Sequence, residues 1–533
     1  MTVVVSGIRL PVNAPEEEAF LAAKQILRRA GMLPREGEYA VYRRSVDARR
    51  GAVSFVYSVA VSGGFSPRAL ARLPLPSIAP ILAEEPRIAP GKLPMEARPL
   101  VVGAGPAGLF CAYLLAREGY RPLLIERGDG VEDRVAAVER FSKTGRLDPE
   151  SNVQFGAGGA GTFSDGKLVS RINDPLTGWF LRLLVEAGAP EDVITKAKPH
   201  VGTDVLRRVV TNLIHRIEEL GGTVRFRTPL SDLRLRGDRV VSVTAGGEEI
   251  PVSCLVLALG NAARDTFRML LSRGIAVEAK PISVGMRIEH LREEIDTALY
   301  GRFAGDPRLG AAEYHLSYDT HGRGVYTFCM CPGGVVVPAA SEEGGVVVNG
   351  MSYRKRDGRN SNSAVVCSVS AEDFGNDPLR GMEFQRAIEE RAYAAGGGGF
   401  CAPITTVGDF LEGKRGTRPT LVTPTYRDGE GVTLASPDDY LPPFVAERIA
   451  PALREFGKKI RGFDAPYAVL TGAETRTSSP IRLLRGEDRR AFGLCNLYPC
   501  GEGAGYAGGI TSAAIDGIRT AVGIISVYKP LSL

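Results

Sequence analysis

The chain is poor in the residues that build metal sites and disulfide frameworks. Its 533 residues include only five histidines and eight cysteines. Five histidines leave little room for a metal site built from histidine, and neither C-x-x-C nor H-E-x-x-H occurs, so we expect no metal. The cysteines lack the dense, regular spacing of a secreted disulfide scaffold, which indicates free thiols in a reducing cytosol.

The sequence also lacks long apolar runs and a strong excess of one charge. No run of about 18 uncharged apolar residues occurs, so we expect no membrane-spanning helix. Residues 1–12 show neither the basic start nor the cleavage site of a signal peptide, which favours a cytoplasmic protein. The 66 basic and 61 acidic residues nearly balance, at a net charge of +5, so we expect no obligate nucleic-acid partner.

What is present is an ordinary globular composition, with 44% apolar and 24% charged residues. The length predicts about two to four structural units. The first unit is expected over residues 1–65, where the pattern predicts a strand, a helix and two strands at 3–10, 16–31, 39–44 and 53–61. The order β-α-β-β suggests half of a ferredoxin-like fold.

The hairpin of this first unit is basic. It carries Arg43, Arg44, Arg49 and Arg50, either as a solvated face or as a contact for nucleic acid or another anionic partner. Eight prolines then stand between Pro67 and Pro99. Prolines at this density oppose regular helices and sheets, so residues 66–98 are predicted to form an extended linker.

Residues 99–127 carry the clearest local motif, which is a buried strand, a glycine turn, a helix and a second strand. Gly103 permits the tight turn, Gly105 lets a pyrophosphate approach the backbone, and Gly108 lets the helix pack on the strand. The helix start offers free N–H groups to phosphate. Glu126, 18 residues after Gly108, is placed to bind ribose hydroxyls. The motif predicts dinucleotide binding. The adjoining residues assigned to the same site are Pro106, Ala107 and Arg127.

Three further features favour FAD over NAD. The first is a glycine cluster at residues 152–168, where a plain NAD-binding domain would continue its β-α-β alternation. The second is a helix at 203–220 followed by a strand meander that ends in a small-residue turn at Gly260, a pattern typical of two-domain flavoproteins. The residues of the glycine cluster assigned to the flavin site are Gly158, Gly159, Thr162, Ser164 and Lys167.

The third feature lies near the C-terminus, at residues 497–521, where a strand leads through a glycine turn into a helix. Gly501 and Glu502 stand in the turn, and Glu502 is expected to bind the ribityl or pyrophosphate region. The helix is expected at 509–518, with Gly509 and Ile510 at its start. Its N-terminal dipole would face the N1–O2 edge of a flavin and stabilise the negative charge of the reduced ring.

Several longer stretches add a family resemblance. The chain resembles the uncharacterised FAD-dependent dehydrogenases of the large glutathione-reductase-like two-domain flavoprotein superfamily, over nearly its whole length. The stretches that carry this resemblance are RRSVDARR, VVGAGPAGL, SNVQFGAGGAGTFSDGKL, ALGNAARDTF, FCMCPGG, NGMSYRKRDGRNSNSAVV, GAETRTSSPIR and GEGAGYAGGITSAA. One departure is Asn261, which stands where the family pattern leads us to expect histidine. If that histidine moves a proton in the family, the role is lost or moved here.

The expected fold class is α/β, with a Rossmann-like FAD-binding domain, an inserted mixed α+β substrate domain and the small N-terminal unit. The predicted divisions are residues 1–65 and 66–98, an FAD-binding domain at 99–275 and 466–533, and a substrate or cap domain at 276–465. Within the insert, strands are expected at 283–288, 325–330 and 346–351, and loops around Asn360 and at 396–399.

Cys329 and Cys331 are candidates for a role beside the flavin or substrate. Two residues apart on a strand, they would lie on one face, too close for an easy disulfide. The C-x-x-x-x-C pair of flavin disulfide reductases is absent from the first helix of the FAD unit. Apolar packing of both thiols is the other interpretation.

Glu474 and Arg476 are the charged candidates. Alternate residues of an extended segment point the same way, so the two would orient a polar substrate or tune the flavin, or else form a structural ion pair. A basic loop holds Arg354, Lys355, Arg356 and Arg359, as an acidic-substrate contact or a solvated turn. The five histidines, which show no catalytic spacing and are expected to be structural, are His200, His215, His290, His315 and His321.

The leading functional prediction is an FAD-dependent oxidoreductase that passes hydride between a small molecule and flavin N5. No second G-x-G-x-x-G follows a clear strand, so NAD(P)H would act as a transient reductant, or a protein partner would carry electrons. The alternatives are a flavoprotein that acts on RNA and a non-catalytic flavin-binding protein.

Overall fold

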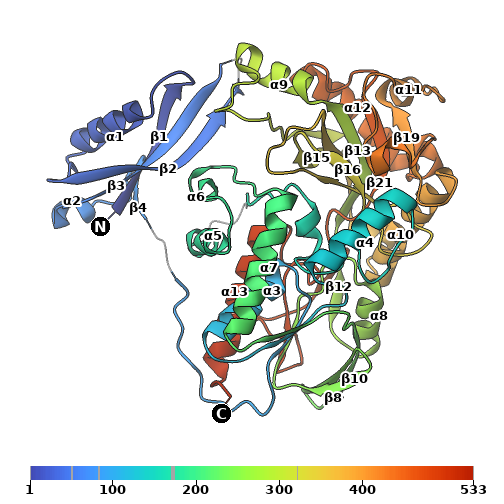
Figure 1. Cartoon of the computed structure of the whole chain (residues 1–533), viewed down its shortest axis with the longest axis horizontal. Helices are drawn as coiled ribbons and strands as arrows, with labels where there is room; N and C mark the ends of the chain where they lie inside the picture. The colour runs from blue at the N-terminus through green and yellow to red at the C-terminus, as the bar shows by residue number, and fades with distance from the viewer. Residues whose placement is uncertain (1, 50–51, 82–84, 170–173, 321, 532–533) are drawn as a thin grey trace.

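The computed structural model describes residues 2–49, 52–81, 85–169, 174–320 and 322–531. Arg50 and His321, two of the residues considered above, lie outside these ranges. Three sheets of four, five and seven strands form the frame of the molecule (Figure 1). Each sheet is described below with the helices that cover it.

The N-terminal sheet is antiparallel, with the order β2-β3-β1-β4. One helix follows β1 and a short helix follows β3, so the unit reads β-α-β-β-α-β. The linker expected over residues 66–98 is therefore not extended throughout, because its first part supplies α2 and β4. Ser66 caps α2 and Pro67 starts it, which is a position where proline is tolerated. The elements are β1 (Thr2–Pro11), α1 (Glu17–Arg29), β2 (Gly37–Asp47), β3 (Ser54–Gly63), α2 (Pro67–Leu70) and β4 (Ile78–Pro80).

The five-stranded sheet is wholly parallel, with the order β23-β11-β5-β6-β7. Its inner strands are short apolar runs, as expected for a sheet covered on both faces. Val101 of β5 faces the helices α3, α7 and α13, whereas Leu100 and Val102 face α8 and a three-stranded antiparallel meander. The strands are β5 (Leu100–Val102), β6 (Leu123–Ile125), β7 (Thr223–Arg225), β11 (Leu255–Leu257) and β23 (Leu497–Pro499).

The helices over the first face come from distant parts of the chain and lie side by side (Figure 1). The glycine turn leads into α3 as predicted, and the helix expected at 203–220 is observed as α7. The last helix, expected at 509–518, continues to Val527 because its later residues are also apolar and buried. These helices are α3 (Pro106–Arg117), α7 (Thr203–Glu219) and α13 (Ile510–Val527), and the meander is β8 (Leu230–Arg236), β9 (Arg239–Ala245) and β10 (Glu248–Pro251), with α8 (Arg264–Ser272).

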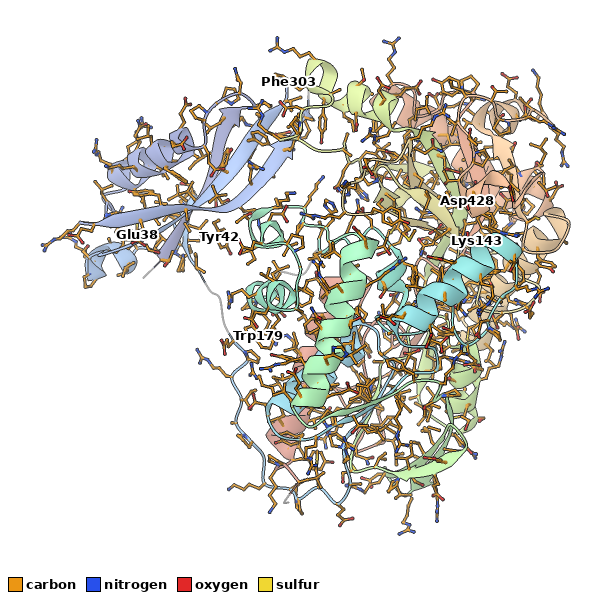
Figure 2. All side chains as sticks on the ribbon, viewed as in Figure 1. Glu38, Tyr42, Lys143, Trp179, Phe303 and Asp428 are labelled. Carbon is orange, nitrogen blue, oxygen red and sulfur yellow. The ribbon has the colours of Figure 1, made fainter. Side chains whose placement is uncertain are left out.

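By length and hydropathy, α13 is the one helix among the described residues that is able to span a membrane, and 61% of that window is buried inside the protein. It packs against α3 and α5 in the core of the parallel-sheet unit. The single tryptophan, Trp179 on α5 (Thr177–Glu186), belongs to the same core (Figure 2). The burial of α13 is that of a core helix.

The seven-stranded sheet has the order β14-β15-β18-β13-β21-β19-β20. Its central strand β13 pairs with β18 along its whole length. Two expectations are wrong here. Residue Asn360 starts β18 rather than a loop, and β21 (Val469–Glu474) joins this sheet although it was placed in the second part of the FAD-binding domain. The other strands are β13 (Ile282–Leu291), β14 (Ser317–Thr320), β15 (Arg323–Cys331), β18 (Asn360–Val369), β19 (Ala402–Thr406) and β20 (Val432–Leu434).

Helices and small strand pairs complete the fold. The helix α12 covers the seven-stranded sheet, and α10 lies between this sheet and the parallel-sheet unit (Figure 1). The remaining helices are α4 (Val131–Thr144), α6 (Asp192–Thr195), α9 (Arg292–Tyr300), α10 (Pro378–Ala395), α11 (Val407–Glu412) and α12 (Pro443–Lys459). The remaining strands are β12 (Val277–Ala279), β16 (Val335–Pro338), β17 (Val348–Met351) and β22 (Ile481–Leu483).

Candidate active site

A cavity of about 340 Å³ opens at the carboxyl ends of β5, β6 and β11 and reaches the seven-stranded sheet. Loops at this edge of a parallel sheet are where α/β proteins bind their ligands. Most of the residues predicted from sequence meet here. Those that line the cavity are Gly103, Gly105, Pro106, Ala107, Glu126, Arg127, Gly159, Ser164, Lys167, Gly260, Cys329, Glu474, Arg476, Glu502, Gly509 and Ile510.

The three glycines of the first turn, Gly103, Gly105 and Gly108, are present for different physical reasons. Gly103 has a positive φ of 99°, and a Cβ there would lie 2.3 Å from the carbonyl oxygen of Ala258. A Cβ at Gly108 would lie 1.8 Å from the carbonyl oxygen of Gly103, so the helix crossing requires glycine. At Gly105 a Cβ would make only an ordinary contact of 3.8 Å with Gly159. The packing of the protein therefore does not require glycine at 105, and the absent side chain leaves room for a ligand to approach the backbone.

At the start of α13, two further glycines of the cavity lining also leave free the space that a side chain would fill. Gly508 and Gly509 precede α13 and line the cavity, and a Cβ at either would meet nothing within 4 Å. They leave the N-terminus of an 18-residue helix open to the cavity, with its partial positive charge. Two helix N-termini, those of α3 and α13, therefore meet one cavity whose glycines leave room for a ligand. This cradle fits the pyrophosphate and the electron-rich ring of FAD.

Glu126 follows β6 as predicted, but most of its hydrogen-bonding capacity is used by the protein. Its carboxylate accepts N–H groups from Ala104 at 2.7 Å, from Gly128 at 3.0 Å and from Gly156 at 2.9 Å. A carboxylate has about four acceptor positions, so one remains for a ribose hydroxyl. Glu126 thus fixes the first turn and the second glycine loop to each other while it lines the cavity.

A buried arginine that the sequence interpretation missed shapes the second glycine loop. The Arg134 guanidinium on α4 is fully buried and donates to the carbonyls of Asn152, Val153 and Ala157, among others. Burial lowers its pKa to about 9. Gly158 and Thr162 do not line the cavity but pack within this loop, since a Cβ at Gly158 would lie 2.0 Å from the Thr162 hydroxyl. Their part in the site is to set the course of the loop.

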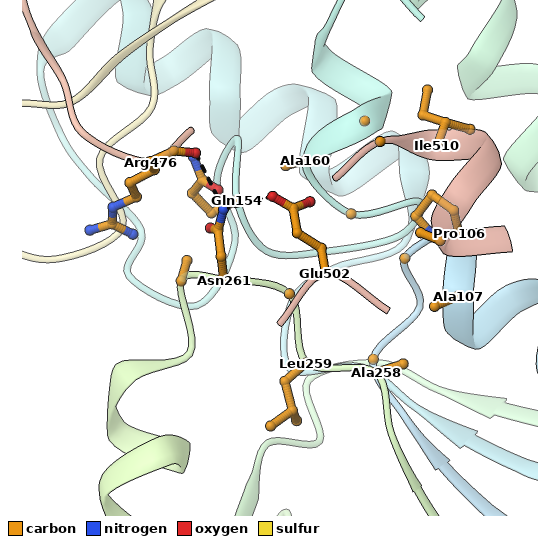
Figure 3. A pocket seen from close by; sticks show the side chains of 18 of the residues that line it. Pro106, Ala107, Gln154, Ala160, Ala258, Leu259, Asn261, Arg476, Glu502 and Ile510 are labelled. Carbon is orange, nitrogen blue, oxygen red and sulfur yellow. Dashed lines mark hydrogen bonds between the residues drawn. The ribbon is translucent and has the colours of Figure 1, made fainter. Parts of the chain in front are cut away.

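Glu502 is the carboxyl group that faces the cavity with the fewest partners (Figure 3). Asn261 donates from Nδ2 to Glu502 Oε1 at 2.9 Å and to the Arg476 carbonyl at 3.2 Å. Loss of hydration raises the pKa of Glu502 to about 7. Asn261, where the resemblance led us to expect histidine, therefore contacts a carboxyl that holds or releases a proton near neutral pH. Gly501, beside it, does not line the cavity.

Glu474 and Arg476 do not form one polar pair, because each has a separate buried partner. Arg287 on β13 donates to both carboxylate oxygens of Glu474, at 2.9 Å each. Arg287 is fully buried and also donates to Asn349, Asn362 and the Cys329 carbonyl. Glu474 reaches the cavity wall as one half of a neutral pair.

Arg476 belongs to a second buried cluster. Glu389 on α10 accepts from Arg476 at 3.2 Å and, through both oxygens, from Arg264 on α8 at 2.8 Å. The Arg264 and Arg476 charges hold the pKa of Glu389 well below its usual range. The Arg476 side chain points away from Glu502 (Figure 3). Arg476 thus helps to hold the insert to the parallel-sheet unit through Glu389 and Arg264, whereas the Arg287–Glu474 pair links two neighbouring strands of the inserted sheet.

The two cysteines of β15 are also separated by the structure. The register of β15 against β18 shifts between Phe328 and Cys331, and Cys329 adopts a positive φ of 45°. As a result Cys329 lines the cavity, whereas Cys331 is fully buried behind it. A hydrogen bond from Cys331 lowers the pKa of the Cys329 thiol, and the nearby Arg287 charge lowers it further.

The serine and lysine of the glycine cluster lie at the rim that faces the insert. Ser164 accepts an N–H from Gly166, and Lys167 lies 3.7 Å from Asp165 and 3.5 Å from Glu313. Arg356 of the basic loop, which was considered a solvated turn or a substrate contact, is instead buried and paired with the same two carboxylates.

The sequence interpretation did not single out four residues that line or support the cavity. Asn349 on β17 and Gln154 in the glycine loop line the cavity, and Arg287 and Glu389 are the buried partners of Glu474 and Arg476. Arg287 and Glu389 lie far along the chain from their partners, and no local pattern marks them. Asn349 and Gln154 stand in stretches that carry the family resemblance, but nothing in those stretches singles them out. The histidines fit the structural interpretation where bonds are observed, since His200 and His290 each bond to a backbone carbonyl.

Comparison with known families agrees with this geometry. Residues 281–477 match the family model described as FAD-dependent protein, C-terminal domain-like, and residues 101–148 match an NAD(P)-binding Rossmann-like domain. The first match spans the seven-stranded sheet from β13 to β21, and the second spans the glycine turn. The protein is therefore a Rossmann-type flavoprotein of the FAD-dependent oxidoreductase class.

The whole chain has a relative. This chain is 43% identical over 534 residues to an uncharacterized protein of Clostridium beijerinckii, and the match covers 99% of both chains. This chain therefore belongs to the same family as that protein. Protein FixC of Escherichia coli K12 is 28% identical over 223 residues, which cover 40% of this chain and 47% of FixC.

Among solved structures, a geranylgeranyl bacteriochlorophyll reductase-like protein of Thermoplasma acidophilum matches with 14% identity and a TM-score of 0.35, covering 81% of this chain and 78% of that one. L-proline dehydrogenase from P. horikoshii matches with 11% identity and a TM-score of 0.34, covering 81% and 93%.

Proposed function

We propose that the protein is an FAD-dependent oxidoreductase that exchanges a hydride equivalent with a small organic molecule. FAD, when bound, supplies the two-electron chemistry at its flavin ring. The observation that carries the proposal is the set of glycines at 105, 508 and 509, which line one cavity and whose missing side chains the packing of the protein does not require.

The residues of the chain divide the work of holding this cofactor. The turn from Gly103 to Gly108 and the start of α3 suit a pyrophosphate. Glu126 keeps one acceptor position for a ribose hydroxyl. The N-terminus of α13 suits negative charge on the ring, because its dipole is unopposed at Gly508 and Gly509.

The substrate side of the cavity is formed by the insert, through Cys329, Asn349 and Glu474. Glu502, with its pKa raised to about 7, is the group that holds or accepts a proton when a substrate is oxidised or reduced there. The buried pairs Arg287–Glu474 and Arg264–Glu389 keep this wall rigid, which orients a bound molecule without adding net charge.

The source of electrons, the superfamily and the location in the cell are part of this proposal. NAD(P)H would enter as a transient reductant, or a protein partner would deliver electrons. Membership of the glutathione-reductase-like superfamily and a cytoplasmic location remain predictions from the sequence.

The first test is the absorption spectrum of the purified protein, followed by anaerobic addition of NADH and then NADPH. We expect flavin bands near about 375 and 450 nm. Bleaching by one nucleotide would identify a reductase, and a flavin that stays oxidised would point to reduction by the substrate or by a protein donor. A colourless protein that takes up no added FAD would overturn the proposal.

A single methyl group tests the site itself. Gly105→Ala has room to fold, with its nearest contact at 3.8 Å, but it places the methyl group against the bound cofactor. We expect at least a tenfold loss of FAD affinity with an unchanged unfolding temperature. Gly64→Ala is the matched control, because its added Cβ also meets nothing within 4 Å but lies in the N-terminal unit. Equal FAD affinity in the two variants would place the cofactor elsewhere.

A further inference from the structure

A second cavity, of about 1150 Å³, lies where the N-terminal sheet meets the rest of the protein. Its walls come from β2, from residues 196–200 after α6, from residues 298–316, from the basic loop at 354–356 and from the end of α12. The edge strand β2 runs beside α6 (Figure 1), and the Ala197 N–H donates to the Arg44 carbonyl at 2.9 Å. The N-terminal unit is thus anchored at one wall of this cavity.

The lining of this basic cavity is strongly positive. Ten lysines and arginines line it, against two carboxylates, Asp47 and Glu313. The chain as a whole is nearly balanced, at 66 basic to 61 acidic residues, so the excess is local. Six of the ten cations are arginines, whose planar groups bind carboxylate or phosphate through two parallel hydrogen bonds.

Some of these cations have a carboxylate of their own, as Arg308 has Asp306 and Arg44 has Glu16. The other carboxylates near the cavity are shared and do not neutralise the cations one for one. Asp47 is shared between Arg9 and Arg49. Asp192 is likewise shared between Arg354 and Lys196.

Glu313 serves three cations at once, Lys167, Lys198 and Arg356. Their charges lower its pKa to about 2, so it is ionised and still outnumbered. Lys355 makes no ion pair within the described part of the chain. The cavity therefore holds a net positive potential toward any entering molecule.

A wall of four charged side chains separates the basic cavity from the active-site cavity. Asp165 and Lys167 line the active site, and Glu313 and Arg356 line the basic cavity. Arg356 donates to Asp165 at 2.9 Å and to Glu313 at 2.7 Å, and Lys167 lies within 4 Å of both carboxylates. The two cavities thus share one wall, made of side chains rather than backbone.

The size of the basic cavity and the apolar residues in its lining indicate what kind of ligand it can bind. Ligand sites for small molecules usually enclose about 300–1,000 Å³, so this cavity is large enough for a molecule of nucleotide size. Phe55, Leu299, Leu309 and Leu316 also line it and suit an apolar or aromatic portion.

Resting on the function proposed above, we propose that the basic cavity binds the substrate, an organic polyanion of about nucleotide size, by its phosphate or carboxylate groups. The cations select for negative charge and raise the rate of encounter. For hydride exchange, the uncharged part of the molecule must pass between the side chains of the shared wall and enter the active-site cavity. The N-terminal unit then supplies part of the substrate site, through Arg9, Arg44 and Arg49.

The test uses protein saturated with FAD, titrated calorimetrically with sodium tripolyphosphate and, separately, with citrate. We expect saturable binding of at least one anion that weakens at least fivefold between 50 and 300 mM NaCl, because screening reduces such attraction. The anion that binds more tightly tells phosphate from carboxylate recognition.

Two double variants locate the binding. Arg44→Gln with Lys355→Gln removes two charges from two different walls of the basic cavity, β2 and the basic loop, and we expect at least a tenfold loss of affinity for the anion that binds. Lys24→Gln with Arg28→Gln is the matched control, since it removes two charges from the exposed face of α1 in the same unit. The control is expected to bind within twofold of the unchanged protein.

Three results would overturn the inference. These are no saturable binding of either anion, equal affinity in the two double variants, and binding of a 20-nucleotide single-stranded RNA in the cavity while both small anions fail to bind. Flavin absorbance read from the same samples keeps the two proposals apart. A yellow protein that binds no anion refutes this inference alone, and a protein that cannot be loaded with FAD refutes the proposed function.

Discussion

The two cavities of this protein share one wall but are built by opposite means. The active-site cavity is lined in part by glycine loops and helix N-termini, and it has charges that are neutralised in buried pairs, such as Arg287–Glu474. The basic cavity is bounded by side chains, and its cations outnumber the carboxylates near them. The active-site cavity offers a ligand helix dipoles and free space, whereas the basic cavity offers it net positive charge.

This difference separates two tasks of binding. A dinucleotide that stays bound is held best by fixed backbone groups, because they lose no side-chain entropy on binding. A molecule that must enter and leave is attracted by mobile charged side chains, which act over longer distances but bind less tightly. Substitutions in the two cavities should therefore affect different quantities, stability and cofactor retention in one and ligand affinity in the other.

The largest expected effect comes from breaking the pair beneath the active-site cavity. Arg287→Met leaves the Glu474 carboxylate buried without its cation and removes the donor to Asn349, Asn362 and the Cys329 carbonyl. Removing one partner of a buried pair costs about 3–5 kcal/mol. We expect a loss of this size in the unfolding free energy, measured by urea denaturation.

The double variant Arg287→Met with Glu474→Leu is the control for this experiment. It removes both charges, and an apolar replacement of a buried pair is often close to neutral in stability. We expect it to recover more than half of the loss. A single variant that loses less than about 1 kcal/mol would contradict the view that this wall depends on the pair.

The next effect is smaller and depends on pH. Because burial raises the pKa of Glu502 to about 7, while the unfolded chain titrates near 4.5, the native state holds the extra proton between these values. Stability therefore falls as pH rises from about 4.5 to 7, by up to about 3 kcal/mol. We expect Glu502→Gln, without FAD, to remove this part of the pH dependence.

Urea unfolding at pH 5, 6, 7 and 8 gives the comparison. The control is Glu38→Gln, which changes an exposed carboxyl on β2 far from both buried clusters (Figure 2). Its curve should run parallel to that of the unchanged protein. If the Glu502→Gln curve also ran parallel, Glu502 would titrate as an ordinary exposed carboxyl.

The contrast between the cavities also decides what could be predicted from sequence. The glycine turn, the helices that follow it and the acid Glu502 were predicted because each depends on residues within one short segment. Gly105 was assigned to the cofactor site from the spacing of the motif alone, and it lines the cavity. The neutralisation of Glu474 could not be predicted, because Arg287 stands 187 residues away and no periodicity marks it.

Two misassignments have physical causes in the inserted sheet. The segment that begins at Asn360 reads as a loop because it starts with Asn, Ser, Asn and Ser, yet it forms a buried strand. Its polar side chains have buried partners, since Asn360 donates to Glu289 and Asn362 accepts from Arg287. The separation of Cys329 from Cys331 follows from a register shift between β15 and β18, which depends on pairing across 30 or more residues and not on local sequence.

The smallest expected effect lies in the basic cavity and completes the comparison. Lys355 is exposed and makes no ion pair within the described residues. Because it supports no part of the fold, Lys355→Gln should change the unfolding free energy by no more than about 0.5 kcal/mol. The same variant should weaken binding of the anion that fills the cavity about threefold, as loss of one exposed charge contact implies. Urea denaturation and calorimetry on one preparation measure both quantities. A marked loss of stability would mean that the cations of this cavity hold the fold together, as the buried pairs of the first cavity do, and the distinction between the two would fail.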